Sequence, residues 1–200
     1  MWSQNKWYSI GGGGDNIRNQ LGKAELAAYT SSLLQGFADA GYTGLFYDIE
    51  TFKVDATYQA FQDSFAIAKA IIPALVIAVS TSYSSPYKTF LTGGFVASDN
   101  LWRKIMADPN VDVISPQLYG DGIDAIITRT YQDPAKGGPP NPNPVTMSKY
   151  AGLSAKVAPS LKLSNFSRFA PQAQQVQDAC DDGRLPPNFC ATGYYAWAGN

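Results

Sequence analysis

The segment Gly41-Tyr-Thr-Gly-Leu-Phe-Tyr-Asp48-Ile-Glu50 is an apolar run that ends in two carboxylates one residue apart. Successive side chains of a β-strand point to opposite faces of the sheet. A strand here therefore places Phe46, Asp48 and Glu50 on one face and three apolar side chains on the other, where helices can cover them. Two acids that project together from a strand end are typical of general acid and base chemistry.

An Asp-x-Glu pair at a strand end also has a plainer interpretation. It can form a solvated corner between a strand and a helix, with the aspartate as the helix cap. Glutamate is otherwise rare in this chain, since Glu25 is the only other one. Its rarity favours a specific role for Glu50, but the ten residues alone leave both interpretations open.

Similar apolar runs recur along the chain and alternate with helical patterns. Strands are expected at 7–10, 44–50, 74–81, 111–119, 161–167 and 193–197. Helices are expected at 21–40, 57–72, 123–131 and 171–179, and another from a cap at Ser98 or Asp99 to residue 107. This alternation predicts an α/β fold with a parallel sheet and right-handed crossovers.

Two architectures fit that order, an open doubly wound sheet and a (β/α)8 TIM barrel. A complete barrel needs about 250 residues, whereas this chain has 200 and its first expected strand begins close to Met1. A barrel would therefore be a single domain over residues 1–200 that lacks the first two βα units. Upstream sequence, self-association with a second subunit or a rearranged smaller sheet would complete it, and the sequence does not decide whether Met1 is the true start.

The composition limits the chemistry. The chain is 45% hydrophobic and 16% charged, which suits one globular core, and its formal net charge is -1 without a basic stripe. Neither nucleic acid nor a membrane is an expected partner. Histidine is absent, which excludes Ser-His-Asp and Cys-His catalysis and most zinc sites. We expect no metal and no cofactor, and carboxylates remain as the acid–base groups.

The two cysteines, Cys180 and Cys190, lie close together on either side of a loop-like spacer. A disulfide between them is the favoured interpretation, and two free thiols are the alternative. A disulfide would indicate an oxidising compartment and hence a secreted protein. Asn165 begins an N-glycosylation pattern, but it falls within an expected strand, so we do not expect it to be used.

Four short segments follow one another at the ends of expected strands. They are Ser9-Ile-Gly11-Gly12, Asp48-Ile-Glu50, Gln117-Leu-Tyr119 and Gly193-Tyr-Tyr-Ala-Trp197. Taken in this order, they resemble the strand-end motifs of the family 18 glycoside hydrolases, and most closely those of the plant class III chitinases. The resemblance covers nearly the whole chain from Trp7 onward, although each motif is short.

The resemblance implies a TIM barrel that cleaves chitin-type, β-1,4-linked N-acetylglucosamine glycans with retention, using the substrate's own acetamide as the nucleophile. Glu50 would act first as general acid and then as base. Asp48 would hydrogen-bond the acetamide nitrogen, and Tyr119 would orient the acetamide oxygen. The sugar subsite would be completed by Ser9, Gly11, Gly12 and Gln117, with Trp197 as its aromatic floor.

Two departures from the family pattern keep a second class of function open. Thr43 and Phe46 stand where the family has acids, and Phe46 removes a carboxyl that could share a proton with Asp48. The first two strands are also missing. The alternative is a catalytically inactive chitinase-like lectin, or a structural glycan-associated protein. A third reading is an acid-pair enzyme on an open α/β sheet with an unrelated substrate.

Overall fold

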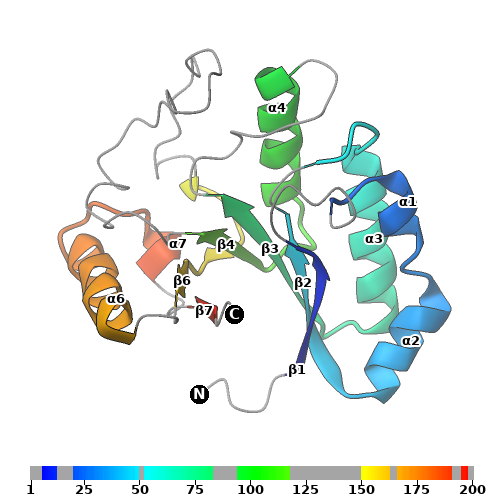
Figure 1. The fold of residues 1–200 in the computed structure, drawn as a ribbon, viewed down its shortest axis with the longest axis horizontal. Coiled ribbons are helices and arrows are strands. Elements are labelled where there is room, and N and C mark those ends of the chain that lie inside the picture. Colours follow the sequence, from blue (N-terminus) through cyan, green and yellow to red (C-terminus); the bar gives the residue numbers. More distant parts are fainter. Residues whose placement is uncertain are drawn as a thin grey trace.

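Seven strands form a single parallel sheet in the computed structural model, which describes residues 6–12, 20–49, 52–82, 94–117, 150–162, 166–190 and 195–197. The strands are β1 (Lys6–Gly11), β2 (Tyr42–Asp48), β3 (Val76–Ser82), β4 (Val113–Gln117), β5 (Lys156–Val157), β6 (Ser160–Lys162) and β7 (Tyr195–Trp197). Their order is β1-β2-β3-β4-β6-β7, with β5 beside β4 (Figure 1).

The order of the strands in the sheet follows their order in the chain. A doubly wound sheet reverses its order at a switch point, and the described strands show no such reversal. β1 and β7 are the two ends of this sheet, and in the part of the chain that the structure describes no pairing joins them. The observed fold is therefore α/β with a singly wound parallel sheet, as the alternating pattern predicted at the level of fold class.

Helices cover one face of this sheet. They are α1 (Lys23–Ala27), α2 (Ser31–Asp39), α3 (Tyr58–Ile71), α4 (Gly94–Met106), α6 (Phe166–Asp181) and α7 (Pro187–Cys190). Side chains from α1, α2, α3, α4 and α6 join alternate residues of β2, β3 and β4 in one large hydrophobic core. We call the helix-covered face of the sheet the outer face.

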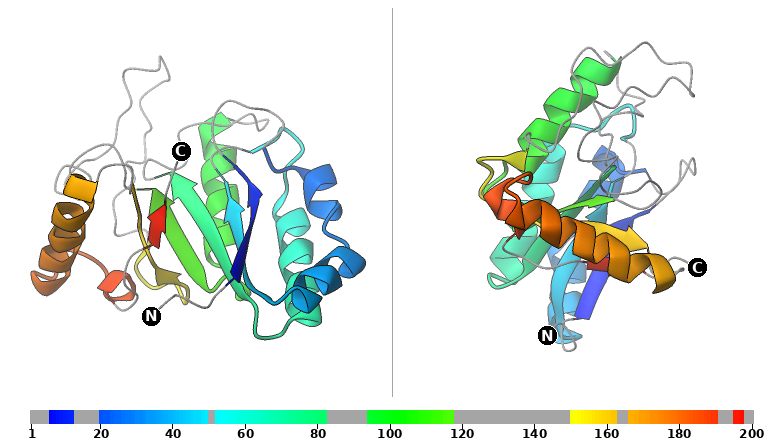
Figure 2. Two further views of the ribbon diagram at one scale, coloured as in Figure 1. Left: turned by 60° about the horizontal axis from the view of Figure 1, so that its bottom comes forward. Right: turned by 90° about the vertical axis from the view of Figure 1, so that its left-hand side faces the viewer.

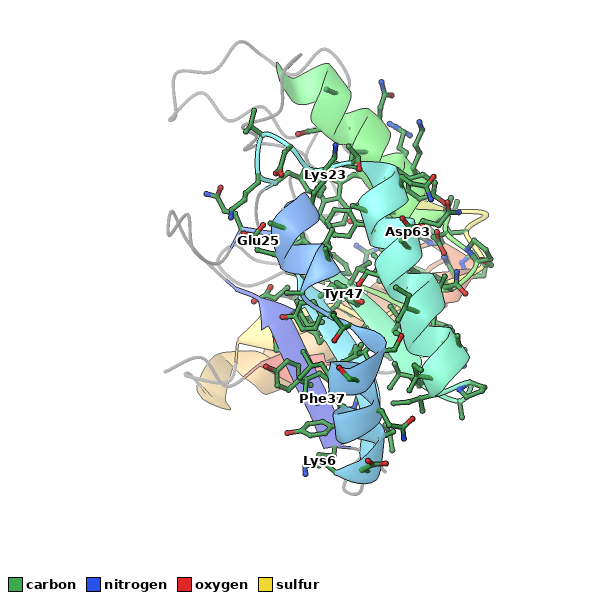
Figure 3. All side chains as sticks on the ribbon, turned by 90° about the vertical axis from the view of Figure 1, so that its right-hand side faces the viewer. Lys6, Lys23, Glu25, Phe37, Tyr47 and Asp63 are labelled. Carbon is green, nitrogen blue, oxygen red and sulfur yellow. The ribbon has the colours of Figure 1, made fainter. Side chains whose placement is uncertain are left out.

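Strand β2 illustrates how the sequence pattern produces this packing. Leu45, Tyr47 and Ile49 are at most 1% exposed and belong to the outer-face core. Tyr47 lies beneath the covering helices (Figure 3). Its ring is edge-on to Phe65 of α3, with ring centroids 4.9 Å apart, and its hydroxyl is 2.8 Å from that of Ser64. Burial raises the pKa of the Tyr47 phenol. The alternation predicted for residues 45–49 is therefore observed.

The opposite, inner face carries a second and smaller apolar cluster. Its buried members are Ala78, Val113 and Ala158, and three partly buried side chains pack against them: Trp7, Phe46 and Val76. Those on β1 to β4 come from neighbouring strands and alternate with residues of the outer-face core, and Ala158 lies between β5 and β6. Because most of the buried members are small, the larger rings of Trp7 and Phe46 find room on this face.

Several predicted boundaries were wrong. The single helix expected at 21–40 is two helices, because Thr30 is extended (φ −72°, ψ 161°) and begins α2 as its N-cap. Leu21 instead bridges to Phe52. The expected cap at Ser98 lies inside α4, which begins at Gly94, and Ser98 is fully buried there.

The region around residues 156–190 differs most from expectation. The strand expected at 161–167 is shorter, since β6 ends at Lys162 and helix α6 already begins at Phe166. Strand β5 and helix α7 were not predicted; both are very short, at two and four residues, and carry no periodic signal. The helix expected at 123–131 and Asn165 lie outside the described residues.

Cys180 lies on α6 and takes part in a disulfide. The only other cysteine of the chain is Cys190, the last residue of α7. Helices α6 and α7 are in contact with each other, and α6 also contacts β6 and α7 contacts β5. A covalent link between the two cysteines would join α6 to α7.

Gly44 allows the Trp7 ring to lie against the inner face, and this generates a stability prediction. A Cβ at Gly44 would overlap the Trp7 indole. Gly44→Ala should therefore lower the free energy of unfolding by about 1–3 kcal/mol, as measured by chemical denaturation. Gly36→Ala on α2, where a Cβ meets nothing within 4 Å, is the control and should stabilise by about 0.5–1 kcal/mol. Equal effects of the two substitutions would contradict this packing.

Candidate active site

The four predicted motif segments all reach the carboxyl ends of strands in one sheet. Gly11 is the last residue of β1, Asp48 of β2, Gln117 of β4 and Trp197 of β7. The strands are parallel, so their carboxyl ends lie at the same edge (Figure 2). Segments far apart in the sequence are thus brought to one edge, which is where parallel α/β proteins build their sites.

The first two segments are connected directly. Gly11 is in register with Asp48, and the backbone N–H of Gly12 donates to the backbone oxygen of Asp48 at 3.1 Å. Gly11 and Gly12 have φ angles of 89° and 146°, a region that favours glycine. The two glycines therefore allow the chain to turn away from β1 while it stays bonded to the end of β2. Ser9 is an exposed residue of β1.

Asp48 is a buried carboxylate, only 8% exposed, on the same face as Phe46. Its Oδ1 atom accepts a hydrogen bond of 2.8 Å from the hydroxyl of Ser80 on β3. That hydroxyl in turn accepts a bond of 2.7 Å from the backbone N–H of Ile49. The carboxylate is therefore held at the strand end by the neighbouring strand.

The helix-cap interpretation of Asp48 was wrong. The next helix, α3, begins ten residues later, and its N-cap is Thr57, whose side chain accepts a bond from the N–H of Ala60 at 3.3 Å. Asp48 instead bonds across the sheet to Ser80. A buried acid that is held by a neighbouring strand is typical of a built site and not of a solvated corner.

Sequence reasoning missed the serines of the inner face. Besides Ser80, it missed Ser115 on β4 and Ser160 on β6, whose hydroxyl oxygens are 2.6 Å apart. All three are at most 4% exposed. The available signal was a serine within an otherwise apolar strand, but its face and partner are known only once the register between strands is known.

Four of the predicted site residues lie wholly or partly outside what the structure describes. Glu50 and Tyr119 lie outside the described residues, and for Gln117 and Trp197 only the backbone is described. The backbone of Gln117 is in register with Ser82 on one side and with Ser160 on the other. Gln117 thus ends its strand at the same edge as Asp48.

The segment after residue 50 is anchored to the segment before α1. Leu21 forms an isolated parallel bridge with Phe52, and the N–H of Lys53 donates to the Leu21 oxygen at 3.2 Å. The side chain of Lys53 also pairs with Glu25, whose other oxygen accepts the N–H of Gly22 at 3.0 Å. Figure 3 shows Glu25 on α1 beside this segment.

Phe52 holds the same segment in place by packing into the core. It is fully buried, and its ring centroid lies 5.9 Å from that of Phe61 and 5.3 Å from that of Trp102. Asp48 on one side and Phe52 on the other are thus both fixed by packing and hydrogen bonds. The described residues on either side of positions 50 and 51 are therefore held in place.

A pocket of about 290 Å³ lies between the start of α3 and α4 and contains none of the predicted site residues; it is lined by Val54, Ala56, Thr57, Tyr58, Ala97, Asn100, Leu101 and Lys104. Among the described residues, no cluster of three or more His, Cys, Asp or Glu side chains is arranged to hold a metal. No described helix is both long and apolar enough to cross a membrane.

No protein-family model matches this chain, and a search of the curated proteins also finds no match. The site is therefore defined by its own residues and their arrangement.

The Glu25–Lys53 pair generates a pH prediction. Burial raises the pKa of Glu25, but the hydrogen bond and charge of Lys53, together with the backbone N–H groups of Glu25 and Gly22, lower it more, so its pKa lies below the ordinary value of 4.5. A lowered pKa in the folded state means that the pair stabilises the fold above the ordinary value and that this is lost as the pH falls through the folded-state pKa.

Glu25→Gln should therefore lower the free energy of unfolding at pH 7 by up to about 1 kcal/mol. The difference from the wild type should shrink towards pH 3. Denaturation curves of both proteins at several pH values measure this. A difference that stays constant from pH 7 to pH 3 would contradict the role assigned to the pair.

Proposed function

We propose that this protein is a glycoside hydrolase of the family 18 type, acting on chitin-type, β-1,4-linked N-acetylglucosamine glycans with retention of configuration. One observation carries the proposal: the four segments that resemble the family's motifs all fall at the carboxyl ends of parallel strands in one singly wound sheet. The family resemblance supplies the substrate and the reaction, and the arrangement of the strands supports the site.

In this proposal, Glu50 protonates the leaving oxygen and later activates water, because it follows the buried Asp48 by two residues in the sequence, as the acid of the resembling motif does. Asp48 accepts a hydrogen bond from the N–H of the substrate's acetamide, whose oxygen attacks the anomeric carbon. Tyr119 orients that oxygen. Gln117 and Trp197 contact the sugar from the ends of β4 and β7, together with Ser9, Gly11 and Gly12 from β1.

The finer architecture is also proposed. A singly wound parallel sheet with helices on its outer face is an arc of the kind from which a (β/α)8 barrel is built. Further strands, from an upstream segment or from a second copy of the chain, would complete the barrel beyond β1. The disulfide at Cys180 supports an oxidising compartment, and we propose that the protein is secreted, with a glycan as its partner and no requirement for a metal or cofactor.

A specific observation favours a second candidate, an inactive chitinase-like lectin or structural glycan-associated protein. Phe46 packs against the apolar cluster of Ala78, Val113 and Ala158 on the inner face. An apolar ring two residues before Asp48 excludes water from this part of the site. Unlike a carboxyl group at that position, it has no proton to share with Asp48. A glycan could still bind to such a site without being cleaved.

Hydrolysis of a fluorogenic chito-oligosaccharide tests the first candidate. Replacing Glu50 by Gln removes the acid but keeps the size of the side chain, so Glu50→Gln should reduce kcat by at least about 100-fold while the oligosaccharide still binds. The matched control is Asp63→Asn. Asp63 is an exposed carboxylate on α3 that bonds to Gln59 at 2.8 Å, and its loss should leave the rate unchanged.

A Glu50→Gln variant as active as the wild type would refute the assigned acid. If the wild type is inert but binds the oligosaccharide in a calorimetric titration, the lectin is the correct candidate. If the wild type neither cleaves nor binds it, the chain shares only the scaffold of the family.

A further inference from the structure

The hydroxyl of Ser80 lies between two groups of the neighbouring strand. It is 2.7 Å from the backbone nitrogen of Ile49 and 2.8 Å from Oδ1 of Asp48. A backbone N–H can only donate, so the Ser80 oxygen accepts that bond and its single proton is directed at Asp48. The bonds therefore run in one direction, from the backbone through Ser80 to the carboxylate, and Oδ1 is an acceptor.

Burial opposes any change in the orientation of the Asp48 carboxylate. Ser80 is fully buried, Ile49 is 1% exposed and Asp48 is 8% exposed. If the carboxylate turned away, the Ser80 proton would be left unpaired in a buried place, which is unfavourable. The carboxylate of Asp48 is consequently held in one orientation by a residue that comes from another strand.

We propose that Ser80 is a positioning residue of the active site, which holds the carboxylate of Asp48 ready to accept the acetamide N–H of the substrate. The proposal rests on the proposed function. It also bears on position 46, where this chain has Phe46 in place of the acid of the family pattern. Phe46, on the same face of β2, offers no polar group to Asp48, whereas β3 supplies a hydroxyl that cannot itself ionise near neutral pH.

Three variants test the role of Ser80. Ser80→Ala removes the hydroxyl, and Ser80→Thr keeps it with one extra methyl group. The matched control is Ser64→Ala, since Ser64 is another buried serine, 3% exposed, whose hydroxyl bonds at 2.8 Å to Tyr47 on the outer face of the same strand β2. Steady-state kinetics on the chito-oligosaccharide and amide hydrogen exchange at Ile49 are measured for each.

Ser80→Ala should lower kcat roughly 10- to 100-fold with KM within about twofold of the wild type, because the acetamide is bound but its partner is misplaced. Ser80→Thr should restore most of the rate, and Ser64→Ala should leave it unchanged. The Ile49 amide should exchange faster in Ser80→Ala only, because only this variant removes the acceptor of its bond.

The outcomes separate the two proposals. If the wild type is active and Ser80→Ala matches it in kcat, the positioning role is refuted and the glycosidase stands. If Ser80→Ala and Ser64→Ala lose activity equally, the effect is general destabilisation and the positioning role is refuted as well. If the wild type itself cleaves nothing, the proposed function fails and the positioning role fails with it, whatever the Ile49 exchange shows about the hydrogen bonds.

Discussion

The parallel register of β1 to β4 is the constraint on which the rest of the structure depends. Pairing Gly11 with Asp48, and Ser80 with Ser115, aligns the carboxyl ends of the four strands. The same register decides which side chains face the helices and which face inward. A slip of one residue in β2 would move Asp48 into the outer-face core and Tyr47 onto the inner face, where neither finds its partners. The site and the core are therefore specified together.

The inner face shows how a buried carboxylate is accommodated in an apolar sheet. An unpaired carboxylate at 8% exposure would be strongly destabilising. Asp48 avoids this through the Ser80 hydroxyl, which is itself paired with the Ile49 backbone. Small residues on the neighbouring strands leave room for this polar group and for the Phe46 ring beneath it. Polar groups gather towards the carboxyl ends of the strands, and apolar ones lie below them.

Much of the fold could be predicted from the sequence because the spacing of apolar residues along the chain indicates which segments are helices and which are strands. The apolar run at 45–49 gave the correct element type and the correct buried face, and the helix expected at 57–72 is observed as α3. What failed depended on tertiary contacts. Thr30 is the extended N-cap of α2, and Leu21 pairs with Phe52 and so lies outside α1, which begins at Lys23. The two-residue strand β5 exists only because β4 pairs with it.

The candidate site was predictable in part, for a similar reason. Asp48 could be found because a carboxylate at the end of an apolar run is unusual in any sequence. Ser80 could not be linked to it, because residues 32 apart in the chain meet only through strand register. Serine is common and each one alone carries little information. Its significance appears only when its hydroxyl is seen between a backbone N–H and a buried acid.

The most direct test of the central claim is the configuration of the first product. The strand-end site is proposed to retain configuration with the substrate's acetamide as nucleophile, so proton NMR during hydrolysis of chito-oligosaccharides should show the β anomer first, followed by slow equilibration with the α anomer. An initial excess of the α anomer would contradict this mechanism, because it would require direct attack by water on the opposite face of the sugar.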